Sequence, residues 1–204
     1  MIRYFRQERI LALDNGSIGY AVYFNDAGYP ETLYFGKRLS DYTDLLSTRG
    51  KGGALSYYDM ATGKERTFAD NYRADAPLEI SPHGRSDKRG APVIVRDASG
   101  SFVTDFRYCR HKIVKGAPEP EGLPHAHGAC ETADIVLEDK RLRVRAHLYL
   151  TIFADKDVLV KSFRFENIGR KKVRLTRALS MQLELPHMDY DLVHKNGRWA
   201  KERD

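Results

Sequence analysis

Residues 140–186 contain three consecutive stretches with the pattern of β-strands, and this region constrains the fold more than any other. Between residues 141 and 153, apolar side chains alternate almost strictly with polar ones. Because successive side chains of a strand point to opposite faces of a sheet, this period of two predicts one apolar face and one polar, solvent-exposed face. The apolar positions are Leu142, Val144, Ala146, Leu148, Leu150 and Ile152.

Two further long strands are expected at residues 158–166 and 173–185. The first is apolar on both faces in part, as expected of a strand covered on both sides. The second alternates again. Short polar turns at residues 155–157 and 167–170 separate the three stretches, and short connections imply antiparallel neighbours. We therefore predict a core built from an antiparallel sheet.

The rest of the chain is expected to be all-β with one long irregular region at residues 38–89. Asn15-Gly16 is a strong hairpin signal between two of the strands. The irregular region holds the best helix candidate, residues 39–46, and a glycine-rich loop without Walker spacing. A loop this long either carries function or is partly disordered. The other predicted strands are residues 9–13, 18–24, 31–37, 77–80, 92–96, 102–108, 109–114 and 132–137.

Composition limits the class of protein. A chain of 204 residues suits one large all-β domain, and no apolar run approaches the ~20 residues that span a bilayer. The first residues lack the pattern of a signal peptide, so we expect a cytoplasmic protein with no membrane partner. Two cysteines, Cys109 and Cys130, make no disulfide framework. The net charge of +6 comes with no nucleic-acid-binding motif, so no nucleic-acid partner is expected.

No complete active site is visible in the residues themselves. His125, His127 and Cys130 have metal-ligand side chains at short spacing, but a fourth ligand is not evident, so a polar loop is the default reading and no metal is predicted. Aspartates are present, but nothing in the sequence pairs them as a glycosidase requires. A nucleophile elbow is absent, and no cofactor is expected.

An ordered set of short motifs resembles the N-terminal region of bacterial family-36 glycoside hydrolases, the α-galactosidases. The resemblance is collinear and covers nearly the whole chain. Related α-N-acetylgalactosaminidases are the weaker match. The motifs are LYFGK at 33–37, RTF at 66–68, SDKRGAPVIV at 86–95, DFRYCRHKIVKGAP at 105–118, GLP at 122–124, FADKDVLVKSFRFENIG at 153–169 and GRWAKER at 197–203.

The resemblance implies a galactose-mutarotase-like antiparallel β-supersandwich, incomplete in this chain, followed in the family by a catalytic (β/α)₈ barrel. Residues 1–204 would then form one N-terminal domain of a larger enzyme. The family's two catalytic aspartates, which act with retention of configuration, lie in the barrel. No residue here is therefore assigned to catalysis, and the isolated chain is expected to be inactive. The parent enzyme would remove terminal α-galactose from sugars such as melibiose and raffinose.

The resemblance also implies a role for four loop residues at the rim of the substrate pocket, often the pocket of a neighbouring subunit in a homo-oligomer. Lys88 replaces the family's aromatic residue and Ser86 its glycine, which weakens a sugar-stacking role there. A salt bridge that pins the loop is the alternative for Asp87 and Arg89. The expected substrate-binding residues are Phe68, Asp70, Asp87 and Arg89.

Two other readings stay open. A free-standing carbohydrate-binding module would expose aromatic side chains on one face, with Tyr57, Tyr58, Phe68 and Trp199 as the candidates. A purely structural interaction protein would expose an apolar patch, and self-association or a disordered C-terminal tail would follow.

Overall fold

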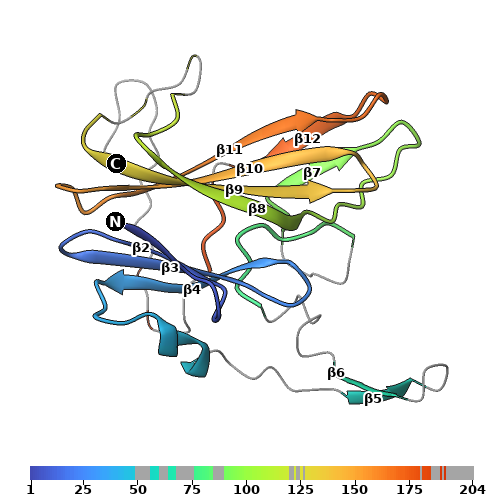
Figure 1. Cartoon of the computed structure of the whole chain (residues 1–204). Helices are drawn as coiled ribbons and strands as arrows, with labels where there is room; N and C mark the ends of the chain where they lie inside the picture. The colour runs from blue at the N-terminus through green and yellow to red at the C-terminus, as the bar shows by residue number, and fades with distance from the viewer. Residues whose placement is uncertain are drawn as a thin grey trace.

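The structure is a computed structural model, and it describes residues 1–48, 56–59, 64–67, 76–84, 90–119, 122, 125, 127–179, 181–184, 189 and 191. Two four-stranded antiparallel sheets lie face to face (Figure 1). The first has the order β1-β2-β3-β4, and the second the order β11-β10-β9-β8. The predicted fold class, an all-β antiparallel sandwich, is confirmed. No helix of the described part has the length and hydrophobicity needed to cross a membrane.

The strands follow the turn signals of the sequence closely. The first sheet is made of β1 (Ile2–Phe5), β2 (Ile10–Asp14), β3 (Ile18–Phe24) and β4 (Pro30–Lys37). The second is made of β8 (Arg107–Lys115), β9 (Cys130–Asp139), β10 (Val144–Phe153) and β11 (Leu159–Asn167). Two two-stranded ribbons complete the described part, β7 (Val93–Arg96) with β12 (Arg174–Ala178) and β5 (Ser56–Asp59) with β6 (Lys64–Thr67).

The main core lies between the two sheets. The alternating residues of β10 supply its centre, with Ala146, Leu148, Leu150 and Ile152 wholly buried. They pack with apolar side chains of β2 and β3. Burying one such side chain stabilises the fold by about 1.5–3 kcal/mol, so this layer is the main source of stability. The apolar side chains from β2 and β3 are Leu11, Leu13, Tyr20, Val22 and Phe24.

The outer face of the first sheet is also covered. Tyr42 and the 3₁₀-helix η1 (Thr43–Thr48) follow β4, and leucines of this segment pack on Ile10, Ala12 and Ala21. A Cβ at Gly19 would lie 2.1 Å from the hydroxyl oxygen of Tyr42, so Gly19 allows the close approach of that ring. This segment is where the sequence predicted a short helix.

Asn15 joins the two sheets at one end of the sandwich. Its side-chain oxygen accepts from the backbone N–H groups of Ser17 and Ile18, which closes the β2–β3 hairpin. Its side-chain nitrogen donates to the carbonyl oxygens of Phe153 and Lys156, at 3.1 and 2.9 Å, in the β10–β11 connection. A residue recognised in the sequence as a turn former therefore also fixes the distance between the sheets.

Two strand predictions are wrong in extent, the expected strand at residues 77–80 is a single bridge at Leu78, and one ribbon was not predicted. The expected strand at residues 102–108 is irregular up to Phe106, because β8 begins only at Arg107. The expected strand at residues 141–153 starts at Val144, since Arg143 has a φ of 57° and belongs to the turn. The irregular region also contains the β5–β6 ribbon, which local alternation did not reveal.

The largest correction concerns the third long strand. We expected residues 173–185 to pair with the preceding strand, but β12 has only five residues and pairs with β7. β11 is consequently an edge strand of its sheet, not a strand covered on both faces. Val158 and Val160, predicted to be covered, are 44% and 36% exposed.

Candidate functional site

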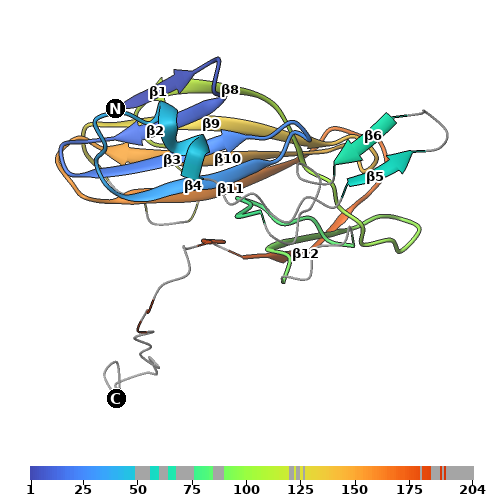
Figure 2. The same ribbon diagram turned by 90° about the horizontal axis from the view of Figure 1, so that it is seen from below.

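The four predicted substrate-binding residues, Phe68, Asp70, Asp87 and Arg89, lie outside the described residues, as does Trp199. The strand β6 ends at Thr67, directly before Phe68, and the β5–β6 ribbon lies below the stacked sheets in Figure 1 and at one end of them in Figure 2. The side chains of Tyr57 and Tyr58 on β5 are likewise outside the described set. The role of these residues at the rim of the substrate pocket therefore stays a prediction, and so does the alternative of a free-standing carbohydrate-binding module.

The candidate metal ligands do not assemble into a site. The rings of His125 and His127 meet edge to face with centroids 4.6 Å apart, whereas Cys130 is buried at the start of β9. Within the described part of the chain, no three His, Cys, Asp or Glu side chains are grouped as a metal site would require.

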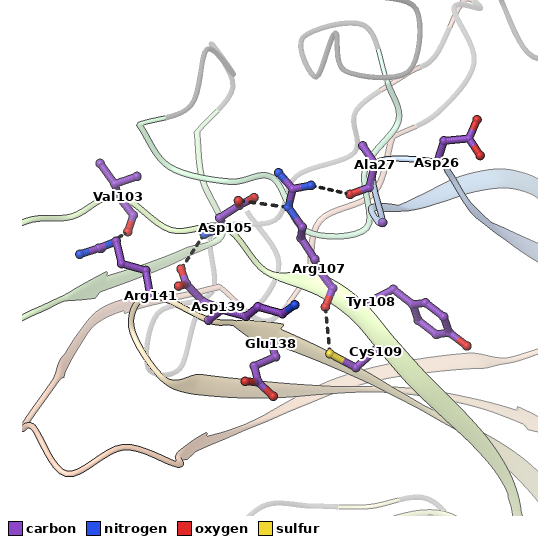
Figure 3. Close-up of a pocket in the computed structure, with 12 residues that line it drawn as sticks. Asp26, Ala27, Val103, Asp105, Arg107, Tyr108, Cys109, Glu138, Asp139 and Arg141 are labelled. Carbon is purple, nitrogen blue, oxygen red and sulfur yellow. Dashed lines mark hydrogen bonds and ion pairs between the residues drawn. The ribbon is translucent and has the colours of Figure 1, made fainter.

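A cavity of about 790 Å³ lies between the β3–β4 turn, the start of β8 and the end of β9 (Figure 3). It opens where the two sheets come together, and its walls come from three segments distant in the sequence. It is lined by Asp26, Ala27, Gly28, Val103, Asp105, Arg107, Tyr108, Cys109, Glu138, Asp139, Lys140 and Arg141.

The carboxylates of this cavity hold the backbone. Asp139 is 1% exposed, and its two oxygens accept from the N–H groups of Asp105 and Leu142, at 2.7 and 2.8 Å. Asp105 in turn accepts from the hydroxyl of Tyr29 and from Nε of Arg107. A general acid or base must reach a substrate proton, and Asp139 is buried with a backbone N–H on each of its oxygens. Asp105 and Asp139 thus hold neighbouring segments together and do not form a catalytic dyad, and we call this group of contacts the cavity joint.

Two arginines complete the joint. Arg107 donates to the carbonyl oxygen of Ala27 at 2.9 Å and lies over the ring of Tyr29, so it links the second sheet to the β3–β4 turn. Arg141 donates to Asp97 and to the carbonyl oxygen of Val103, both at 2.6 Å. These contacts fix the irregular residues 101–106 against the end of β9.

Cys109 in the cavity wall is not an activated thiol. Burial raises its pKa, and the nearby carboxylate of Glu138 raises it further. A nucleophilic cysteine needs the opposite, an electropositive setting that lowers the pKa.

The outer face of the second sheet carries a buried histidine–aspartate pair. Nδ1 of His147 lies 2.8 Å from Asp134, and Nε2 lies 3.3 Å from the guanidinium of Arg164. Because a guanidinium can only donate, we assign the Nδ1–H tautomer, which donates to Asp134. Both ring nitrogens are then occupied, and the described neighbourhood offers no nucleophile for the histidine to activate.

Among the residues described, the polar clusters of the sandwich hold the backbone and the two sheets together, and none of them forms a reactive constellation. The sequence matches the glycosyl hydrolase family 36 N-terminal domain over residues 28–204. The chain belongs to this family.

Relatives of known activity support the assignment. The chain is 33% identical to α-galactosidase AgaA of Geobacillus stearothermophilus over 207 residues, which covers 99% of this chain and 28% of that protein. It is 30% identical to α-galactosidase Mel36A of Lactobacillus acidophilus, with 100% of this chain and 28% of that protein covered. The chain thus spans just over a quarter of the length of these relatives.

Solved structures show the same fold. The family-36 α-galactosidase AgaB of G. stearothermophilus superimposes with a TM-score of 0.84 at 30% identity, covering 100% of this chain and 27% of that one. A variant of AgaA in complex with raffinose gives a TM-score of 0.82 at 31% identity, covering 95% of this chain and 27% of that one. The predicted family is confirmed.

Proposed function

We propose that this chain serves as the non-catalytic N-terminal domain of an α-galactosidase that hydrolyses terminal α-galactosyl residues of oligosaccharides with retention of configuration. The observation that carries the proposal is a sequence match. Almost the whole chain aligns with α-galactosidases, and the aligned region is just over a quarter of the length of each of these enzymes. The reaction needs a close pair of carboxylates, one as nucleophile and one as acid and base. Asp105 and Asp139, which meet in the cavity, are committed to backbone and side-chain donors instead.

The proposed substrates are raffinose-type sugars. Variants of the Geobacillus enzyme AgaA have been solved in complex with raffinose and with stachyose. Both ligands are galactosyl oligosaccharides, so the substrate class follows from the relatives and not from a pocket of this chain.

Within that enzyme we assign the sandwich two tasks, as a scaffold and as part of the pocket rim. Phe68, Asp70, Asp87 and Arg89 are the proposed rim residues. The support is the β5–β6 ribbon, which leaves the sandwich and ends directly before Phe68. Homo-oligomer formation and a cytoplasmic location belong to the same proposal. The first depends on the family resemblance, and the second on the first residues, which do not have the pattern of a signal peptide.

A turnover assay tests the proposal. The purified chain of 204 residues should release no p-nitrophenol from p-nitrophenyl α-galactoside, because the resemblance places the carboxylate pair in the family's barrel. Fusing it to the remaining three quarters of AgaA, in place of the matched region, should give an enzyme that hydrolyses the same compound. Turnover by the chain alone would contradict the non-catalytic role, and a soluble but inactive fusion would contradict the scaffold role.

A further inference from the structure

Residues 78–84 form a strap whose backbone is held at every second residue. The strap begins beside β4, where a single bridge joins it to that strand. Three of its backbone N–H groups donate to different partners, each at 2.9 Å: a carbonyl oxygen of β4, the side-chain oxygen of Gln182 and the hydroxyl of Thr104. Two of these partners are side chains, so single residues decide where the strap lies. The three donors are Glu79, Ser81 and His83.

Thr104 holds the end of the strap through two hydrogen bonds to one residue. Its hydroxyl accepts from the N–H of His83, and its own N–H donates to the carbonyl oxygen of His83 at 3.0 Å. Thr104 is 1% exposed, so water has little access to either bond. The strap then turns at Gly84, where φ is 74° and a Cβ would lie 3.0 Å from Cγ2 of Val103. A left-handed residue in so close a contact favours glycine, which fixes the point where the strap ends.

The cavity joint fixes Thr104 in turn. The residues on both sides of Thr104 are held from the end of β9 and the turn after it (Figure 3). The carbonyl oxygen of Val103 accepts from Arg141 at 2.6 Å, and the N–H of Asp105 donates to Asp139 at 2.7 Å. A continuous series of contacts therefore runs from the second sheet through Thr104 to the strap.

The strap leads directly into the part of the sequence that contains two of the proposed rim residues. Gly84 is three residues before Asp87, and Gly90 is one residue after Arg89. The chain is held again just beyond Gly90, because Ala91 is 2% exposed and β7 begins two residues later. A short connection must follow its two ends when either of them moves. The end of the strap is thus the nearest held point before Asp87.

We propose that Thr104 is a positioning residue for the rim of the substrate pocket. Its hydroxyl connects the cavity joint to the strap and so sets the starting point of the connection that contains Asp87 and Arg89. The inference rests on the function proposed above, since it takes these two residues to contact the sugar. Thr104 is itself buried, so its effect on the reaction is exerted through substrate binding and not through the chemical step.

The first test measures the hold on the strap in the whole chain, without any enzyme activity. Residues 85–89 contain three arginines and lysines, at which trypsin cuts. Thr104→Val keeps the size of the side chain and removes the oxygen that accepts from His83, so the end of the strap should open more often. Mass spectrometry of limited digests should show cleavage at these sites about fivefold faster than in the native chain. Thr104→Ser keeps the hydroxyl and should stay within about twofold.

Thr132→Val is the matched control for this exchange. Thr132 is also buried, and its hydroxyl donates to the carbonyl oxygen of Gly116 at 2.6 Å and lies 2.7 Å from the hydroxyl of Thr151. It therefore loses buried hydrogen bonds within the second sheet, and cleavage in residues 85–89 should stay within about twofold. Circular dichroism and thermal midpoints check that each variant is folded at the temperature of the digest.

A second variant tests the same series of contacts from the surface. Arg141 is half-exposed, so Arg141→Met disturbs folding less than a change in the interior does. It removes the donor that holds the carbonyl oxygen of Val103, next to Thr104. Cleavage in residues 85–89 should become about threefold faster, because the support of Thr104 is loosened and not lost.

The second test uses the fusion with the rest of AgaA. With raffinose as the substrate, Thr104→Val should raise KM by about threefold or more and leave kcat within about twofold. Thr104→Ser and Thr132→Val should change neither constant by more than about twofold. A merely structural role of Thr104 would lower the amount of folded enzyme, and with it the apparent kcat, and would leave KM where it was.

Three outcomes overturn the proposal. The first is cleavage of the Thr104→Val chain at the native rate, and the second is equal acceleration by Thr132→Val. The third is a native KM for raffinose in an active Thr104→Val fusion, which would separate the strap from the rim. An inactive native fusion would overturn the proposed function and with it the rim role of Thr104, whereas the cleavage rates of the chain alone do not depend on that function.

Discussion

β10 and β11 are neighbours in one sheet, yet only one of them has a covered inner face. They pair without a break from Val144 and Asn167 to Ile152 and Leu159. The inward residues of β10 are wholly buried, whereas those of β11 are half-buried. The first sheet packs against β10, whereas Glu79 and the segment after β12 contact Lys161 on the inward face of β11. Alternation in a sequence thus shows which face is apolar and not whether another layer covers it.

A polar clamp partly replaces the missing apolar cover at β11. Lys161 donates to Glu79 at 2.6 Å, and their side chains are 4% and 0% exposed. The other carboxylate oxygen of Glu79 accepts from Tyr20 and Thr32 in the first sheet. Burial is the main cause that raises the pKa of Tyr20 well above its ordinary value, and the nearby charge of Glu79 raises it further. Tyr20 therefore stays a neutral donor. The clamp joins β3, β4 and β11 through one carboxylate.

The largest effect is expected from breaking this clamp. Lys161→Met should lower the free energy of unfolding by about 3–5 kcal/mol, because Glu79 would be left as a buried charge without its cation. Urea unfolding followed by circular dichroism measures this change in the free energy of unfolding. The double variant Lys161→Met/Glu79→Gln should recover much of the loss, since it removes both charges. A loss below about 1 kcal/mol for the single variant would mean that β11 does not depend on the clamp.

The next effect compares the two strands directly. Leu148→Ala on β10 should cost about 3 kcal/mol, through lost burial and the cavity left behind. Phe163→Ala on β11 should cost only about 1–2 kcal/mol, although it removes more atoms, because part of the side chain is already exposed to water. The same urea titration compares the two. The reverse order would contradict the open face that we assign to β11.

The two strands also show how far the sequence predicts the fold. The bounds of β3 and the buried positions of β10 follow from alternation and flanking turns, which are local properties. The partner of β12 could not be predicted, because its pairing with β7 joins two segments that are distant in the sequence and leaves no local signal. The same limit holds for the candidate site. Arg107, Tyr29 and Asp139 meet in one joint only after folding, so no spacing rule identifies them.

A smaller effect separates the two strands of the β7–β12 ribbon. Val95 on β7 is 2% exposed, and Val95→Ala should cost about 1.5 kcal/mol for the apolar groups removed. Leu175, its register partner on β12, is exposed, and Leu175→Gln should change the free energy of unfolding of the isolated chain by no more than about 0.5 kcal/mol. Urea unfolding of both variants measures the two losses. Equal losses at the two positions would show that β12 is covered in solution.

The smallest effect lies at the cavity joint, where Asp97 accepts from Ser99 and Arg141. The Ser99 hydroxyl, and after it Arg141, hold the pKa of this carboxyl far below its ordinary value of 3.8. A lowered folded-state pKa gives stability that is complete above the unfolded pKa and is lost as the pH falls through that value toward the folded one. Asp97→Asn should therefore be less stable than the native chain at pH 6, and the difference should shrink steadily below about pH 4. Thermal midpoints of Asp97→Asn and of the native chain, measured across this pH range, test the prediction. A gap between Asp97→Asn and the native chain that widened in acid would mean that folding raises the pKa of Asp97, the opposite of what its donors require.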